Sequence, residues 1–297
     1  MDFHINPGTG QQFVLNLQEG SLLHSPSPDK QALSLPICIY GYGYFIAGPD
    51  HYTDRTKPHP FHQIFITHRG RGRFIIGGCE YIAEPGTVLL LDCSQPHRYE
   101  SFGGVWEHEW VNFIGTACPA YHKLIYPEGF RIFPLNGNRE IPALLREIRD
   151  FTATLDPLHC VQAGTGVIRL LDAIYALSVQ HQRERLRDRQ QNILRSVRFM
   201  EEHYMEPLTL DMLAQSAYLS RYYYLRSFRQ YMGVTPGEHL TQLRISHARQ
   251  LLLATRLTVE EIGWQTGFGG SKNLIRHFRQ ATGLTPGEFR RTEGSHP

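Results

Sequence analysis

The pattern of apolar and polar residues divides the chain into a strand-rich first part and a helical second part. Between residues 33 and 138, short β-branched and aromatic runs alternate with turn residues such as Gly77-Gly78 and Pro85-Gly86. The clearest of these runs are 64–67, 73–76, 87–91 and 110–114. Many short strands at close spacing are typical of an antiparallel sandwich or barrel. The pattern therefore predicts a β-barrel over residues 33–138.

Two stripes of apolar residues at helical spacing follow the predicted barrel and indicate two helices within residues 139–182. The first stripe consists of Ile141, Leu144, Leu145, Ile148 and Phe151. The second consists of Val167, Leu170, Leu171, Ile174 and Leu177. Either stripe could pack on the barrel or on a second copy of the chain. We take the second stripe as the candidate dimerisation surface and predict a homodimer. The polar run 183–192 is interpreted as a linker, with an exposed helix end as the alternative.

A repeat organises the remaining residues, 193–297, which show a helical pattern with short breaks. Residues 208–239 and 257–289 align closely, with Thr235-Pro236-Gly237-Glu238 matching Thr285-Pro286-Gly287-Glu288. Each copy predicts a short helix after a threonine, a turn, and a longer helix that ends at Gly233 or Gly283. The second copy has one extra residue in its turn. This order of elements predicts two helix-turn-helix units in an all-α domain.

The longer helix of each copy has an apolar face and a face that carries long polar side chains. Arginine and lysine near the start of such a helix suit guanine in the major groove, and asparagine suits adenine. The candidate DNA-binding residues are Arg221, Tyr222, Leu225, Arg226, Ser271, Lys272, Asn273 and Arg276. An ordinary helical hairpin with a solvated basic face is the alternative, and the duplication of the unit argues against it.

Charge is distributed unevenly along the chain. Residues 1–182 carry 13 Lys/Arg and 17 Asp/Glu, whereas residues 183–297 carry 17 Lys/Arg and 11 Asp/Glu. Sixteen of those 17 C-terminal cations are arginines, which favour bidentate contacts to phosphates and bases. A basic C-terminal domain suits nucleic acid, although a solvated arginine-rich surface would show the same balance.

Length and composition indicate an ordinary globular protein. The 297 residues are sufficient for about two domains, and 41% of them are apolar. No run approaches the roughly 18 apolar residues of a membrane helix, and the start of the chain does not resemble a signal peptide. The five cysteines include no Cys-x-x-Cys pair, so we expect a reduced cytoplasmic protein without membrane association.

The C-terminal residues resemble the AraC/XylS family of bacterial transcription regulators. The resemblance covers about 100 residues and includes Leu243-Arg244-Ile245-Ser246-His247-Ala248-Arg249, Gly267-Phe268 and Gly283-Leu284-Thr285-Pro286. It implies that the candidate residues of the two longer helices contact DNA. Two departures are apolar residues, Leu225 and Ile275, where family members often have polar side chains; a third is Gly270 in place of a capping side chain.

The N-terminal half resembles the cupin-like effector domain of the same family, of the arabinose-sensor type. The matching segments are Arg69-Gly70-Arg71-Gly72, Pro96-His97-Arg98-Tyr99 and Trp106-Glu107-His108-Glu109-Trp110. The resemblance implies a sugar pocket lined by Arg55, Tyr99, His108 and Trp110, and an N-terminal arm over residues 1–32. An aromatic ring for the C–H face of a sugar and fixed donors for its hydroxyls suit that task.

The hypothesis is therefore a sugar-responsive transcription regulator, an activator, of α+β class: an effector barrel, dimerisation helices and two helix-turn-helix units. Its expected partners are double-stranded DNA, a small-molecule effector, a second copy of the chain and RNA polymerase, at the nucleoid in the cytoplasm. One alternative is a cupin enzyme fused to a DNA-binding module, but His59, His62, His68 and His97 form no His-x-His metal motif. We expect no enzyme, metal or cofactor. Another alternative is a regulator that senses an aromatic acid or a protein.

Overall fold

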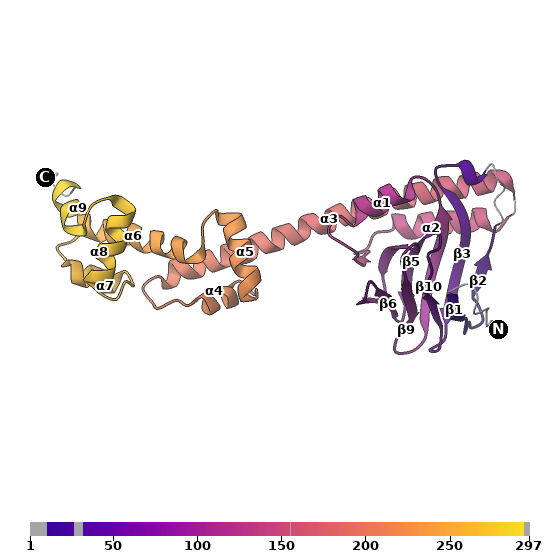
Figure 1. Cartoon of the computed structure of the whole chain (residues 1–297), viewed down its shortest axis with the longest axis horizontal. Helices are drawn as coiled ribbons and strands as arrows, with labels where there is room; N and C mark the ends of the chain where they lie inside the picture. The colour runs from indigo at the N-terminus through magenta and orange to yellow at the C-terminus, as the bar shows by residue number, and fades with distance from the viewer. Residues whose placement is uncertain (1–10, 27–31, 155, 294–297) are drawn as a thin grey trace. The chain divides into compact units, whose positions relative to one another are not determined.

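The computed structural model describes residues 11–26, 32–154 and 156–293. The chain divides into two compact units, Met1–Gln182 and Arg183–Pro297 (Figure 1). Of the predicted arm over residues 1–32, residues 1–10 and 27–31 lie outside the described residues, including Phe3 and Ile5.

The first unit is built on two antiparallel β-sheets. One sheet has the strand order β1-β4-β9-β6-β7, and the other has the order β11-β8-β5-β10-β3-β2. The strands of the five-stranded sheet are β1 (Gln11–Val14), β4 (Tyr52–Arg55), β6 (Gly72–Ile76), β7 (Cys79–Ala83) and β9 (His97–Ser101). Those of the six-stranded sheet are β2 (Leu22–His24), β3 (Cys38–Ala47), β5 (His62–Arg69), β8 (Thr87–Asp92), β10 (Trp106–Ile114) and β11 (Phe133–Pro134). All four predicted strand runs are confirmed.

The strand-rich unit has two hydrophobic cores, one on each face of the six-stranded sheet. Both faces carry apolar residues because successive side chains of a strand point to opposite faces. Phe65 of β5 joins Phe74 and Tyr99 of the other sheet in a cluster between the two sheets. Its neighbours Ile64 and Ile66 face the opposite side, where three helices cover the sheet. These are α1 (Cys118–Ile125), α2 (Glu140–Thr152) and the first part of α3 (Pro157–His203).

The residues predicted to form a dimer surface belong to this second core. Val167, Leu170, Leu171 and Ile174 are fully buried, and Leu177 is 7% exposed, all within one copy of the chain. Their apolar side chains pack on the sheet and on α2, so they leave no surface for a second copy. The assignment of these five residues was therefore wrong, and the sheet-packing alternative applies.

Helix α3 is the one helix of the described segments that is long and apolar enough to cross a membrane by length and composition. Half of its most apolar window is buried inside the protein. One such helix is weak evidence for a membrane span, because buried core helices pass the same test of length and composition. The same helix continues through residues 183–192, so the segment interpreted as a linker is helical.

The second unit contains the end of α3 and six further helices. They are α4 (Leu210–Ser216), α5 (Arg221–Met232), α6 (Pro236–Ala254), α7 (Val259–Gln265), α8 (Ser271–Thr282) and α9 (Pro286–Glu293). One small core lies around Tyr224 and Phe228 of α5, and a second around Leu274 and Phe278 of α8. The predicted α+β class is thus confirmed, with a strand-rich unit followed by an all-α unit.

Capping residues set the limits of these helices much as the repeat predicts. Thr209 and Thr258 accept from the first turns of α4 and α7, and Gly233 and Gly283 end α5 and α8 with left-handed φ angles of 76° and 81°. Ser220 and Gly270 occupy the N-cap positions of α5 and α8 without a side-chain cap hydrogen bond. At α8 the Glu260 carboxylate accepts from the Ser271 amide at 2.8 Å and caps the helix from outside.

Candidate functional site

A cavity of about 170 Å³ lies within the strand-rich unit. It is smaller than the roughly 300–1,000 Å³ of typical pockets for drug-sized ligands, so its size suits a small molecule. Its lining comes from the arm, from both sheets and from the loop before β4: Phe13, Leu15, Leu23, Phe45, His51, Thr53, Arg55, Gln63, Tyr99, His108, Trp110 and Asn112.

All four residues that the sequence suggests for the effector pocket line this cavity. Tyr99 lies on β9, Arg55 lies on β4, and His108 and Trp110 lie two positions apart on β10. Side chains two positions apart in a strand share a face, which explains why Asn112 joins them and why Thr53 joins Arg55. Their assignment to effector binding remains a prediction.

The cavity has an aromatic wall and tightly positioned rings. Trp110 meets Phe45 edge to face with 5.4 Å between ring centroids, and His108 stacks on Trp106 at 3.6 Å. A side chain at Gly43 would place its Cβ 2.4 Å from the Trp110 ring, so glycine at this position makes room for the indole. Flat aromatic faces of this kind accept the C–H face of a sugar as well as other apolar surfaces.

Several polar atoms in the cavity have no partner among the described residues. They are both ring nitrogens of His51, Nε of Arg55, Nε2 of His108 and Oδ1 of Asn112. Burial lowers the pKa of His51 to about 4 and that of His108 well below its usual value, so both rings are neutral at pH 7. Buried polar groups without partners are costly, and a polar ligand would satisfy them.

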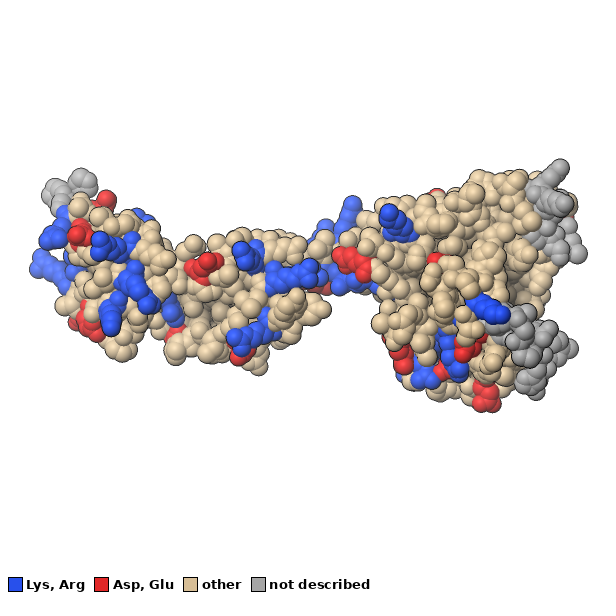
Figure 2. Space-filling view, viewed as in Figure 1, with Lys and Arg blue, Asp and Glu red and all other residues tan. Residues whose placement is uncertain are grey.

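The predicted DNA-binding residues lie mainly on exposed surfaces of α5 and α8. Tyr222 is 70% exposed and Leu225 is 37% exposed on α5, with Arg221 and Arg226 also exposed. On α8, Lys272, Asn273 and Arg276 are exposed and Ser271 is half-buried. The space-filling view shows many Lys and Arg side chains over this unit (Figure 2).

Several of these residues already have contacts within the protein, including Arg276, whose Nη2 lies 3.0 Å from Nε2 of His277. The Asn273 side-chain amide donates to the Phe268 carbonyl at 3.0 Å, so one of its donors fixes the turn before α8. Arg221 lies 3.7 Å from the Asp211 carboxylate at the surface. The apolar Ile275, which departs from the family pattern, is 40% exposed beside Arg276, as Leu225 is beside Arg226.

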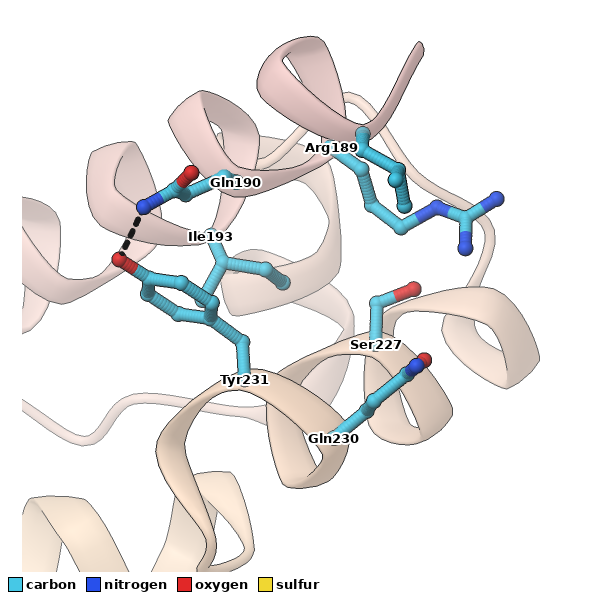
Figure 3. Close-up of a pocket in the computed structure, with 7 residues that line it drawn as sticks. Arg189, Gln190, Ile193, Ser227, Gln230 and Tyr231 are labelled. Atoms are coloured by element: carbon cyan, nitrogen blue, oxygen red, sulfur yellow. Dashed lines mark hydrogen bonds between the residues drawn. The ribbon is translucent and has the colours of Figure 1, made fainter. Parts of the chain in front are cut away.

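A second hollow lies within the helical unit, between α3 and α5. It has a volume of about 250 Å³ and includes Arg189, Gln190 and Ile193 of α3 and Tyr231 of α5. The Gln190 side-chain amide donates to the Tyr231 hydroxyl at 2.6 Å across one side of it (Figure 3). None of the predicted site residues lines this hollow.

Outside the arm, sequence reasoning missed five polar and aromatic residues that line this cavity. These are Phe45, His51, Thr53, Gln63 and Asn112. Alternation from the predicted Arg55 and Trp110 would have found Thr53 and Asn112, whereas the other three need the three-dimensional arrangement. As for metals, no group of three or more His, Cys, Asp or Glu side chains within residues 11–26, 32–154 and 156–293 is arranged to hold an ion.

Two protein-family models match the chain. An AraC-like ligand binding domain matches residues 39–155, and a helix-turn-helix domain matches residues 213–292. The first match contains all four predicted cavity residues, and the second contains both α5 and α8.

Similar proteins include transcription regulators at low identity. The HTH-type transcriptional activator RhaS of Escherichia fergusonii is 24% identical over 256 residues, covering 82% of this chain and 88% of the relative. RhaS of Salmonella schwarzengrund is 23% identical over 258 residues, covering 82% and 88%.

Similar solved structures cover about a third of the chain. A transcriptional regulator with an AraC-type DNA-binding domain from Chromobacterium violaceum is 31% identical, covering 36% of this chain and 96% of that chain, with a TM-score of 0.34. The DNA-binding domain of AdpA in complex with a target DNA is 31% identical, covering 33% and 89%, with a TM-score of 0.33.

Proposed function

Because the chain belongs to the AraC family of transcription regulators, we propose that it activates transcription in response to a sugar or a related carbohydrate. It is a DNA-binding regulator with a small-molecule ligand-binding domain, and this family is not enzymatic. The observation that supports the carbohydrate most strongly is the cavity itself. It combines the Trp110 ring with unpartnered polar atoms of His51, His108 and Asn112.

These groups match the two surfaces of a sugar. An aromatic ring packs on the C–H face, while the neutral His51 ring offers one donor and one acceptor to hydroxyl groups. The Nδ1–H of His108 faces the Trp106 carbonyl at 3.4 Å, so this ring offers its Nε2 as an acceptor. The Asn112 carbonyl oxygen accepts from a further hydroxyl. An apolar ligand would leave these polar atoms unsatisfied at a cost of about 1–3 kcal/mol each.

The two helix-turn-helix units would read one asymmetric DNA site. They flank α6, whose 19 residues span about 28 Å at 1.5 Å per residue. Successive major grooves on one face of DNA are about 34 Å apart, a distance that two units joined by this helix could bridge. We further propose that the protein acts at the nucleoid in the cytoplasm, as a homodimer that contacts RNA polymerase. The interface of this homodimer must then be formed by residues other than the five buried apolar residues between Val167 and Leu177 of α3.

Effector binding would act on DNA binding through a shift in population. The sugar must bind one arrangement of the regulator more tightly than the other, because equal affinity for both shifts nothing. The arrangement favoured by the sugar is then the one that activates.

A thermal-shift screen of the full chain against pentoses, hexoses, uronates and aromatic acids tests the effector proposal. A ligand at 100 times its dissociation constant adds about 2.7 kcal/mol to the free energy of unfolding of the unit that it binds. We expect a stabilising sugar whose effect is lost in Trp110→Ala and retained in Trp264→Ala, since Trp264 is exposed in the helical unit. A screen in which only aromatic acids stabilise would contradict the carbohydrate proposal.

Replacement of Arg276 or Lys272 by alanine tests the DNA-binding surface. Loss of a base contact is expected to weaken binding by about 1–3 kcal/mol and to relax the preference at one base pair. Lys123→Ala serves as the matched control, because it removes the same charge from an exposed position on α1 of the other unit. Equal losses for Lys123→Ala and Arg276→Ala in a gel-shift titration would argue against base contacts by α8.

A further inference from the structure

Arg55 of β4 is a buried cation without a counter-charge. Its side chain is 6% exposed, and no ion pair of the described residues includes it. One Nη1–H points to the Cys93 Sγ at 3.5 Å, and the guanidinium lies 4.9 Å from the centre of the Phe61 ring. The Nε–H has no partner. A guanidinium has five N–H donors, so most of its hydrogen-bonding capacity is unused.

The groups around Arg55 do not neutralise it. Burial raises the pKa of the Cys93 thiol to about 12 despite the nearby arginine, so the sulfur is uncharged at pH 7. The neighbouring carboxylates are engaged elsewhere: Asp54 lies 3.6 Å from Arg98, and Asp92 accepts from the Ser94 amide at 2.9 Å.

The cavity wall also lacks acidic residues. Among its twelve lining residues there is no aspartate, glutamate or lysine, and His51 and His108 are neutral at pH 7. Arg55 is therefore the one charged group that lines it. A buried charge without a partner is strongly destabilising, whereas a bidentate arginine–carboxylate pair is among the strongest protein contacts.

The remaining polar atoms indicate what accompanies the negative charge. The unpartnered atoms of His51, His108 and Asn112 are contributed by the loop before β4 and by β10, separately from the Arg55 guanidinium. A ligand that satisfies all of them needs several hydroxyl groups in addition to one carboxylate. An aromatic acid would pair with Arg55 but leave the other polar atoms unsatisfied.

We propose that the effector is a sugar acid, a monosaccharide whose carboxylate pairs with Arg55 while its hydroxyl groups bind His51, His108 and Asn112. This inference rests on the proposed function, because it assumes that the cavity binds a carbohydrate. It changes the expected effector from a neutral sugar to an anionic one.

Calorimetric titration of the full chain with matched pairs of ligands tests the inference. The pairs are galacturonate with galactose and glucuronate with glucose, which differ only at C6, where a carboxylate replaces the CH2OH group. Benzoate is titrated as a representative aromatic acid. At least one acid is expected to bind 10-fold or more tightly than its neutral partner. Arg55→Gln should abolish that preference, and Arg55→Lys should retain part of it because the positive charge remains. Arg71→Gln, at an exposed arginine outside the cavity, should change nothing.

The possible outcomes separate the inference from the proposed function. A neutral sugar that binds as tightly as its acid, or an acid preference that survives in Arg55→Gln, overturns the sugar-acid inference and leaves the carbohydrate proposal intact. Binding of benzoate but of none of the four sugars overturns both, as does the absence of any binding. If Arg55→Gln fails to fold, the affinities of the wild-type chain for each acid and its neutral partner still test whether the effector is a sugar acid.

Discussion

Replacing Gly263 by alanine is expected to unfold the second helix-turn-helix unit and to abolish its contribution to DNA binding. An added Cβ at this helical position would lie 2.4 Å from the backbone carbon and oxygen of Gly270. Backbone cannot give way as a flexible side chain can, so α7 and the turn before α8 would have to separate. We expect a loss of more than about 2 kcal/mol in stability, even though alanine favours helices by about 1 kcal/mol over glycine.

The repeat supplies an internal reason for this sensitivity. The first helix-turn-helix unit has Ala214 at the position that matches Gly263. Ala214 is buried at 3% exposure, and the turn of this unit is one residue shorter. Gly287→Ala is the control, because a Cβ there meets no atom within 4 Å. The measurement is the unfolding midpoint by circular dichroism together with a gel-shift titration. If Gly263→Ala matched Gly287→Ala in both the unfolding midpoint and the gel-shift titration, α7 would not pack as closely against this turn as the structure shows.

Lowering the pH from 7 to 4 is expected to destabilise the strand-rich unit strongly. Burial lowers the pKa values of His51 and His97 to about 4, against an ordinary value of 6.5. Their neutral forms are therefore favoured in the folded protein. The stability that they contribute is complete above pH 6.5 and is lost as the pH falls from 6.5 towards 4. Each shift corresponds to about 3 kcal/mol at pH values below both pKa values.

Urea unfolding at several pH values measures this effect. In a Trp264→Phe background the tryptophan fluorescence comes from the buried Trp106 and Trp110 and so reports on the strand-rich unit. His51→Gln should reduce the slope of stability against pH, whereas His203→Gln, at the end of α3 in the helical unit, should leave it unchanged. A stability that stays constant between pH 7 and pH 4.5 would show that these histidines are not held neutral by the fold.

The sequence predicted the helical unit in most details because its signals are local. Threonine caps, glycine stops and the apolar face of Tyr224, Phe228, Leu274 and Phe278 each depend on residues a few positions apart. Because the unit is repeated, each predicted cap, stop and apolar face is supported by two aligned segments. The external cap of α8 by Glu260 was not predictable in this way, because it depends on how α7 and α8 pack.

The strand-rich unit was predictable as strands but not as a set of contacts. Alternation alone does not say which strands meet, so His51 and Gln63 could not be placed beside Trp110 in advance. The stripe on α3 shows the same limit, because an apolar stripe has the same spacing whether it packs on its own sheet or on a second copy. Here Val167 and Leu171 pack within the chain.

Selection of DNA sites from random duplexes by the full chain tests the central claim most directly. If both recognition helices read bases, the selected duplexes will share one asymmetric motif with two conserved blocks about 10 base pairs apart. Arg276→Ala should remove the preference at one position within one block. Equal binding of all sequences at every salt concentration would contradict the claim that this protein regulates transcription by binding a specific DNA sequence.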